Sequence, residues 1–472
     1  NKTSRKWLKL ECNYRRVNKY VLTLFLFLSV LLFLTNTLNS KEPLPLMDTE
    51  ISVNRETRES FAAPIPSLSL KKMRQFTGGR HLFRRTWTPA PSSVKSLDGL
   101  GPVFNRVSCS GCHVKDGRGR PPEEGSKFRS MVIKLSMNKN NKVLPDPNYG
   151  YQLNDKAILG VPYEGKATIS YSQREIFYKD KSKAELSVPH YHFHSLSFGP
   201  LNTNTNYSGR VAPAVFGLGL IEAIKQEDII KNQDILDTNN DGISGKANFI
   251  IDVPSNKKVL GRFGWKATRG TLLHHIAGAA SEDMGLTSSI FPKLNCMHIQ
   301  KECSKQINGG TPEISQKQIN MLQVYMQTLA VPRQRDVNDK EVIAGSNLFK
   351  KIGCENCHVS TYITGKHKDH EELSNRVIKP YSDFLLHNMG PELDDGLQEG
   401  KVKSREWKTP PLWGIGLVKV VNRHTRFLHD GRAKSIEEAI LWHGGEGLGS
   451  KEKFLSLSAK ERRKILKFLS SL

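Results

Sequence analysis

The sequence is poor in negative charge. Its 472 residues carry 46 Asp and Glu against 70 Lys and Arg, a formal net charge of +24. This balance disfavours a cationic ligand and favours an acidic partner or an anionic membrane surface. Zinc-finger spacing and repeated basic-aromatic patterns are absent, so we expect no nucleic-acid partner. The 38% hydrophobic content suffices for a sizeable core, which excludes wholesale disorder.

Long hydrophobic runs are also lacking, except near the start of the chain. A basic segment, residues 1–19, leads into the unbroken apolar stretch 20–34. A membrane span usually needs about 20 apolar residues, and residues 35–40 offer no convincing cleavage site. A cleaved signal peptide and an uncleaved membrane anchor at 1–40 therefore both stay open. Either predicts export of the remainder, to the periplasm or another extracytoplasmic space.

Internal repeats are scarce, but one short signature occurs twice, as Cys109-Ser-Gly-Cys112-His113 and Cys354-Glu-Asn-Cys357-His358. Two thiols at i and i+3 can each bond to a haem vinyl group, and the adjacent imidazole then becomes the proximal iron ligand. A thioredoxin-like pair would not need the histidine, and a structural zinc site would need partner pairs at finger-like spacing. The sequence therefore predicts two covalently bound haem c groups.

Helix signals cluster around the second signature. Asn338 and Glu341 are spaced as a capping box, which predicts a helix that leads directly into Cys354. Ser458 and Glu461 predict a second helix that ends at Leu472. Period-two patterns predict strands at 166–178, 248–253 and 259–263.

Several longer segments together resemble the exported dihaem oxidoreductases of the peroxidase or thiol oxidoreductase-like type. The segments are 104–109, 116–122, 209–213, 217–223, 261–267, 283–285, 409–414 and 428–432. The resemblance runs from about residue 78 to 472. More distantly, the chain is similar to bacterial dihaem cytochrome c peroxidases and methylamine-utilisation dihaem enzymes. Those relatives imply that one haem stores an electron while the other meets the oxidant.

We therefore expect a mainly α protein with two cytochrome c-like haem domains, inserted β hairpins and the N-terminal signal or anchor helix. The proline-rich residues 41–77 are predicted to be a linker. The first haem domain is expected at 78–335 and the second at 336–472.

The resemblance places His443 at the distal ligand position of the second haem. Ser435 and Glu438 are expected to cap the helix that His443 ends. A role as an ordinary helix C-cap is the alternative for this histidine. Met389 is the rival ligand, because a methionine thioether is a normal cytochrome c ligand.

The distal side of the first haem is less determined. The candidates between the two signatures are His190, His192, His194, His274, His275 and Met284. The resemblance implies that His275, with Glu282 or Asp283, assists peroxide cleavage as the catalytic group. It also implies that Trp265 lies near the gap between the haems.

Two further features are independent of the haem signatures. Asp237, Asn239, Asp241 and Ser244 place oxygen donors in a calcium-like loop, although Asn248 stands where a bidentate Glu is expected. A plain Asx turn is the alternative. Cys296 and Cys303 are left over in an exported chain and are predicted to form a structural disulfide.

We therefore expect an exported dihaem enzyme that transfers electrons between two haems and reduces peroxide. The expected partner is an electron-donor cytochrome or another acidic redox protein, and the N-terminal segment is expected to contact the membrane. A non-catalytic electron carrier and a haem-based redox sensor are the competing interpretations.

Overall fold

The computed structural model describes residues 47–140 and 142–472. The predicted signal or anchor segment, residues 1–40, lies outside these ranges. The described chain belongs to one compact unit. Within the described ranges, no helix is both long and apolar enough to cross a membrane.

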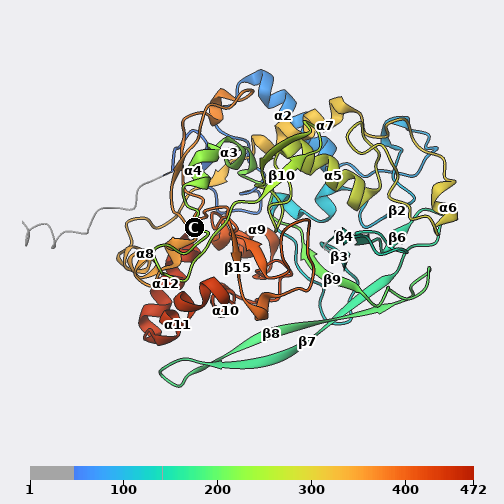
Figure 1. Ribbon diagram of the computed structural model, residues 1–472. Coiled ribbons are helices and arrows are strands. Elements are labelled where there is room, and N and C mark those ends of the chain that lie inside the picture. The colour runs from blue at the N-terminus through green and yellow to red at the C-terminus, as the bar shows by residue number, and fades with distance from the viewer. Residues whose placement is uncertain (1–46, 141) are drawn as a thin grey trace, which may run out of the picture. The chain divides into compact units, whose positions relative to one another are not determined.

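The prediction of a mainly α fold is wrong, because the chain is 29% helix and 20% strand. Helices and several small sheets are interleaved (Figure 1). The helices of the described part are α2 (Leu70–Arg84), α3 (Leu218–Ala223), α4 (Gln226–Ile230), α5 (Leu272–Met284), α6 (Lys301–Ser304), α7 (Gln316–Gln327), α8 (Lys340–Lys351), α9 (Val418–Asn422), α10 (Ile436–Leu441), α11 (Leu448–Ser456) and α12 (Ala459–Ser471).

Most strands are short, and the two longest, with 12 residues each, form one hairpin. They are β1 (Ser52–Val53), β2 (Val103–Phe104), β3 (Met131–Lys139), β4 (Lys142–Leu144), β5 (Gln152–Leu153), β6 (Lys156–Ala157), β7 (Lys166–Phe177), β8 (Lys183–His194), β9 (Thr205–Val211), β10 (Phe249–Asp252), β11 (Lys257–Leu260), β12 (Val331–Pro332), β13 (Tyr362–Ile363), β14 (Val377–Ile378), β15 (Leu386–Asn388) and β16 (Glu406–Lys408). The strands predicted at 166–178 and 248–253 are present as β7 and β10 with slightly shorter bounds. The segment predicted at 259–263 overlaps β11, which pairs with β10 in an antiparallel hairpin.

Two helix pairs repeat the same construction. Helix α2 packs on α7, and α8 packs on α12. At each crossing a glycine allows close approach: a Cβ on Gly79 would collide with the Met321 carbonyl oxygen, and a Cβ on Gly345 with that of Lys464. Four residues after each glycine, Phe83 and Phe349 reach the histidine of the nearby Cys-x-x-Cys-His turn, each with its ring centroid 6.1 Å from the imidazole.

The helix boundaries follow local capping chemistry. Helix α8 starts after Asp339 rather than Asn338, because the Asp339 carboxylate accepts hydrogen bonds from the amides of Glu341 (2.7 Å) and Val342 (3.1 Å). Ser458 and Glu461 form the predicted capping box of α12. The cap predicted at Ser435 is also present, since its hydroxyl accepts from the Glu438 amide.

The main apolar core contains side chains from both sides of residue 335, among them Leu322, Tyr325, Phe384 and Trp413. From residue 47 onward, the segment predicted as a linker contributes Ile51, Phe61 and Ile65 to the same core. The domain boundaries given above stay predictions.

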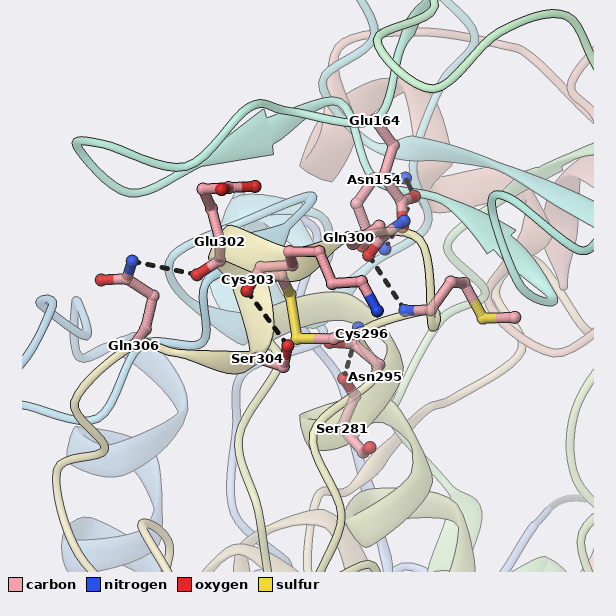
Figure 2. Close-up of a disulfide and its surroundings, with 12 residues drawn as sticks. Asn154, Glu164, Ser281, Asn295, Cys296, Gln300, Glu302, Cys303, Ser304 and Gln306 are labelled. Atoms are coloured by element: carbon pink, nitrogen blue, oxygen red, sulfur yellow. Dashed lines mark hydrogen bonds between the residues drawn. A yellow bond between two sulfur atoms is a disulfide. The ribbon is translucent and has the colours of Figure 1, made fainter.

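The predicted disulfide joins Cys296 to Cys303, with 5.8 Å between the Cα atoms (Figure 2). Gln300 lies in the loop that it closes, and its side-chain amide donates to Glu164 at 2.8 Å. Burial raises the pKa of Glu164 to about 8. The disulfide loop is therefore attached to the segment that leads into the β7–β8 hairpin.

The crossing of α8 and α12 yields a stability prediction. Replacing Gly345 with Ala should lower the free energy of unfolding by about 1–3 kcal/mol, because the added methyl group meets backbone that cannot rotate away. Gly449→Ala in α11 is the matched control, since nothing lies within 4 Å of the added methyl group. Urea unfolding followed by circular dichroism measures both, and equal stability of the two variants would contradict the packing argument.

Candidate functional site

Both Cys-x-x-Cys-His signatures fold into the same tight turn. Residues Cys109–Gly111 and Cys354–Asn356 each form one turn of 3₁₀ helix. The amide of His113 donates to the Cys109 carbonyl at 3.0 Å, and that of His358 to the Cys354 carbonyl at 2.9 Å. The turn holds the two thiols and the imidazole of each signature close together, as covalent haem attachment requires.

Each signature histidine is oriented by a backbone carbonyl. The Nδ1 of His113 lies 2.7 Å from the Pro213 oxygen, and the Nδ1 of His358 lies 2.9 Å from the Tyr381 oxygen. A carbonyl only accepts, so Nδ1 carries the proton and Nε2 keeps its lone pair. Burial lowers the pKa of both rings to about 4. Both imidazoles are therefore neutral at physiological pH, the form that ligates iron.

The four signature thiols are free of disulfides. Burial raises the pKa of Cys109, Cys112 and Cys354 to about 12, and it also raises that of Cys357. Catalytic dithiols have lowered pKa values instead. A thiol redox pair is therefore disfavoured at both turns, whereas thioether attachment fits.

A cavity of about 300 Å³ joins the second turn to the first half of the chain. Its walls include Cys354, Cys357 and His358 together with His275 and Pro213, the residue that orients His113. The lining is mostly apolar, as in cofactor sites generally. The hollow therefore borders the second signature directly, and of the first site it borders Pro213, whose carbonyl orients His113.

Three cations line this cavity and form no salt bridge with a carboxylate of the described chain: Arg118, Arg262 and Lys408. Burial lowers the pKa of both arginines to about 10 and that of Lys408 to about 8. The Nε of Arg118 is buried and makes no hydrogen bond. Buried cations of this kind call for an anionic group in the hollow. Haem carries two carboxylates, so the site fits it in charge as well as in its Cys and His donors.

Both predicted distal ligands reach the second turn. His443 and Met389 line the cavity that contains His358. A Cβ on Gly447 would lie 3.1 Å from His443 and 3.2 Å from the Met389 methyl group, so the two candidates are neighbours. The Nδ1 of His443 donates to the Ala439 carbonyl at 2.8 Å, which leaves Nε2 available as a ligand.

Of the distal candidates for the first haem, His274, His275 and Met284 lie on α5 together with Glu282 and Asp283, whereas His190, His192 and His194 lie on β8. Arg269 pairs with Glu282 at 2.7 Å, and Lys134 pairs with it from the other side. Burial opposes ionisation of Glu282, but these two cations prevail and lower its pKa to about 2. Burial raises the pKa of the adjacent Asp283, which accepts a hydrogen bond from Gln152 at 2.8 Å.

The structure separates the His274 and His275 pair. His275 lines the cavity, and its ring nitrogens have no hydrogen-bond partner in the described chain. Burial, aided by the charge of Arg269, lowers its pKa to about 3. His274 instead faces Asp252 at 3.3 Å. Met284 is buried in the apolar core.

Trp265 lies in the wall of the same cavity. Its Nε1 donates to the Val211 carbonyl at 2.9 Å, and the Arg118 guanidinium lies 5.7 Å from its ring centroid. The hydrogen bond satisfies the polar edge of the indole and holds its ring against the hollow.

Side-chain oxygens of the calcium-like loop accept hydrogen bonds from the loop's own backbone amides. Asp237 and Asn239 both accept from the Asp241 amide, at 3.0 and 2.9 Å. Asn248 donates to Ala267 and takes no part in the loop. The loop contacts the second turn through Asp241 and Asn356 (3.1 Å), and Ser244 contacts Glu446 (3.0 Å).

One group beside the second turn was missed from the sequence. His387 lies between two carboxylates, with Nε2 at 2.8 Å from Asp383 and Nδ1 at 2.6 Å from Glu446. Burial disfavours its charge, but these bonds raise its pKa well above the usual value. Its Nδ1 also lies 3.7 Å from the Cys357 sulfur. The i, i+4 spacing of Asp383 and His387 was the only local signal, and Glu446 is remote in sequence.

Comparison with known proteins is consistent with this geometry. Residues 48–472 match the model of a family described as "di-haem oxidoreductase, putative peroxidase". No curated protein and no solved structure matches the chain. Because the family match covers nearly all of the described residues, this chain belongs to the di-haem oxidoreductases, a family whose description implies two haems.

Proposed function

We propose that this protein is an exported peroxidase that moves electrons between two covalently attached haem c groups and reduces hydrogen peroxide. The observation that carries the proposal is the shared cavity, which borders the Cys354–His358 turn, His443, Trp265 and His275. A simple electron carrier does not need an unpartnered imidazole facing such a hollow.

The residues of the chain suffice to hold both groups. Cys109 and Cys112 would form the thioethers of the first haem, and Cys354 and Cys357 those of the second. His113 and His358 would be the proximal ligands. When bound, haem supplies iron centres that store electrons and pass them to peroxide. The cations Arg118, Arg262 and Lys408 would balance the haem carboxylates.

Side chains of α5 are proposed to transfer the protons that peroxide reduction needs. Reduction of hydrogen peroxide to two waters consumes two electrons and two protons. His275 is neutral because its pKa is about 3, so it can take a proton from one peroxide oxygen and return it to the departing oxygen. The ionised Glu282, held by Lys134 and Arg269, favours the transiently charged ring. Burial raises the pKa of the adjacent Asp283, which is the second proposed proton-transfer group.

Trp265 is proposed to mediate electron transfer across the cavity. Its fixed indole and the nearby Arg118 line the hollow whose walls also include His358 and His275. The remaining electrons would come from an acidic donor, such as a small cytochrome, since the chain carries a net charge of +24.

Calcium and the exported location belong to the same proposal. Asp237, Asn239, Asp241 and Ser244 would ligate calcium, and the loop is linked to the second turn through Asn356. The disulfide and the haem c signatures both require an oxidising compartment, periplasmic or otherwise extracytoplasmic. The N-terminal segment would then act as the export signal or as an inner-membrane anchor.

Covalent attachment is tested by mass. The intact protein should exceed the mature polypeptide by two haems, and an acid-acetone wash should leave both attached, because thioether bonds survive it. Cys357→Ala should lose covalent attachment at one site, whereas Cys296→Ser/Cys303→Ser should retain both haems. Extraction of free haem from the wild type would contradict the assignment.

The distal ligand of the second haem is tested by potential. His443→Met should raise the potential of that haem, on the order of 100 mV within the roughly 0.8 V that axial ligands span, and should introduce the near-infrared thioether band. Met389→Leu should change neither property. A wild-type protein that already shows this band, and loses it in Met389→Leu, would identify Met389 as the ligand.

The catalytic step is tested by stopped-flow mixing of the half-reduced protein with peroxide. His275→Ala should slow haem oxidation at least about tenfold, because general acid–base catalysis typically contributes 10²- to 10⁴-fold. Because the His275 ring is already neutral above about pH 3, lowering the pH from about 8 to 5 should not remove its contribution. His274→Ala is the control and should keep the wild-type rate.

Two outcomes distinguish the rival functions. Wild-type oxidation no faster than that of a simple cytochrome would favour an electron carrier or a redox sensor over a peroxidase. A wild-type rate in His275→Ala would keep the reaction but remove this residue from it.

A further inference from the structure

Three histidines alternate along the outer face of β8 and take no part in the cavity. His190, His192 and His194 are exposed, while Tyr191 and Phe193 between them point inward. The two inward rings pack edge-on against Tyr207, with centroid distances of 6.0 and 4.8 Å. Figure 1 shows β7 and β8 as a long hairpin along one edge of the described unit. The strand period thus places all three imidazoles on one solvent-facing surface.

Each of these rings keeps one nitrogen free. His190 Nε2 lies 2.8 Å from the Ser172 hydroxyl, and His192 Nε2 lies 2.8 Å from the Ser170 hydroxyl. His194 uses Nδ1 on Ser195 at 3.3 Å. In the described chain the second nitrogen of each ring has no hydrogen-bond partner. Either nitrogen of a neutral imidazole can ligate a metal.

We propose that this histidine row binds a divalent transition-metal ion through two adjacent imidazoles, with His192 as the ligand common to both possible pairs. Same-face neighbours on a strand have Cα atoms about 6.6–6.8 Å apart. Two nitrogens bound to one tetrahedral ion at about 2.0–2.1 Å lie roughly 3.4 Å apart, so each ring must lean about 1.7 Å toward the other. Exposed side chains can make this movement by rotation about χ1 and χ2.

The spacing also sets the roles of the three residues. His190 and His194 are separated by four residues, roughly 13 Å along the strand, which is too far for one ion to bridge without His192. His192 can pair with either neighbour. The row therefore offers two overlapping sites, of which only one can be filled at a time.

The ligand chemistry selects the class of ion. Imidazole suits Zn²⁺, Cu²⁺ and Ni²⁺, whereas Ca²⁺ and Mg²⁺ require oxygen donors. Cu²⁺ should bind most tightly among the first-row divalent ions. This site is separate from the proposed haem chemistry, since none of the three histidines lines the cavity.

The test is titration of the full haem-loaded protein, purified without a polyhistidine tag, with Zn²⁺ in a calorimeter. His192→Asn should weaken binding at least about 100-fold, because it removes both chelating pairs and the advantage of a linked second ligand. His190→Asn and His194→Asn each leave one pair, so each should weaken binding by less than about threefold. His298→Asn removes an exposed histidine elsewhere and should change nothing.

Cu²⁺ paramagnetic resonance provides the second measurement. The wild type should show nitrogen coupling from two imidazoles, and His192→Asn should lose it. Haem content and circular dichroism should be unchanged in all variants, which separates loss of ligands from unfolding. Equal affinity of the wild type and His192→Asn, or equal losses in the three single variants, would overturn the proposal.

Discussion

The hydrogen bond from each signature histidine to a backbone carbonyl is the interaction on which the site depends. It fixes the tautomer and the ring plane, and it leaves Nε2 as the only free ligand atom. For His358 the carbonyl belongs to Tyr381, a residue nearby in sequence. For His113 it belongs to Pro213, which lies a hundred residues away. The orientation of His113 therefore depends on the folding of the intervening residues, which form strands β3 to β9.

This requirement gives the strands a role that the expected α fold did not include. Strand β9 pairs with β3 over seven residues and ends at Val211, just before Pro213. The Val211 carbonyl also holds the indole of Trp265. A sheet edge thus orients both the proximal histidine of the first site and the aromatic residue in the cavity wall. The loops between β3 and β9 carry the long β7–β8 hairpin.

Hydrogen bonds and a cation–π contact join the β7–β8 hairpin to the last helices of the chain. The Tyr178 hydroxyl donates to Glu437 at 2.8 Å, and the Arg462 guanidinium lies 3.7 Å from the Tyr178 ring centroid. The Ser187 amide donates to the buried Glu438 at 2.6 Å. Glu438 belongs to α10, whose last turn leads to His443. These contacts limit movement of the candidate distal ligand relative to the hairpin, because a buried carboxylate without its amide donor is costly.

The sequence by itself determined the local chemistry: the two Cys-x-x-Cys-His turns, the caps of α10 and α12, and the disulfide. Each depends on residues close in sequence, or on residue types with few other uses in an exported chain. Tertiary structure decided what depends on packing between distant segments. It placed His275 in the cavity and His274 on Asp252, and it paired Glu446 with His387. It also replaced the expected mainly α fold with a mixed one, because strand pairing and the burial of ionised groups are set by neighbours that no local pattern specifies.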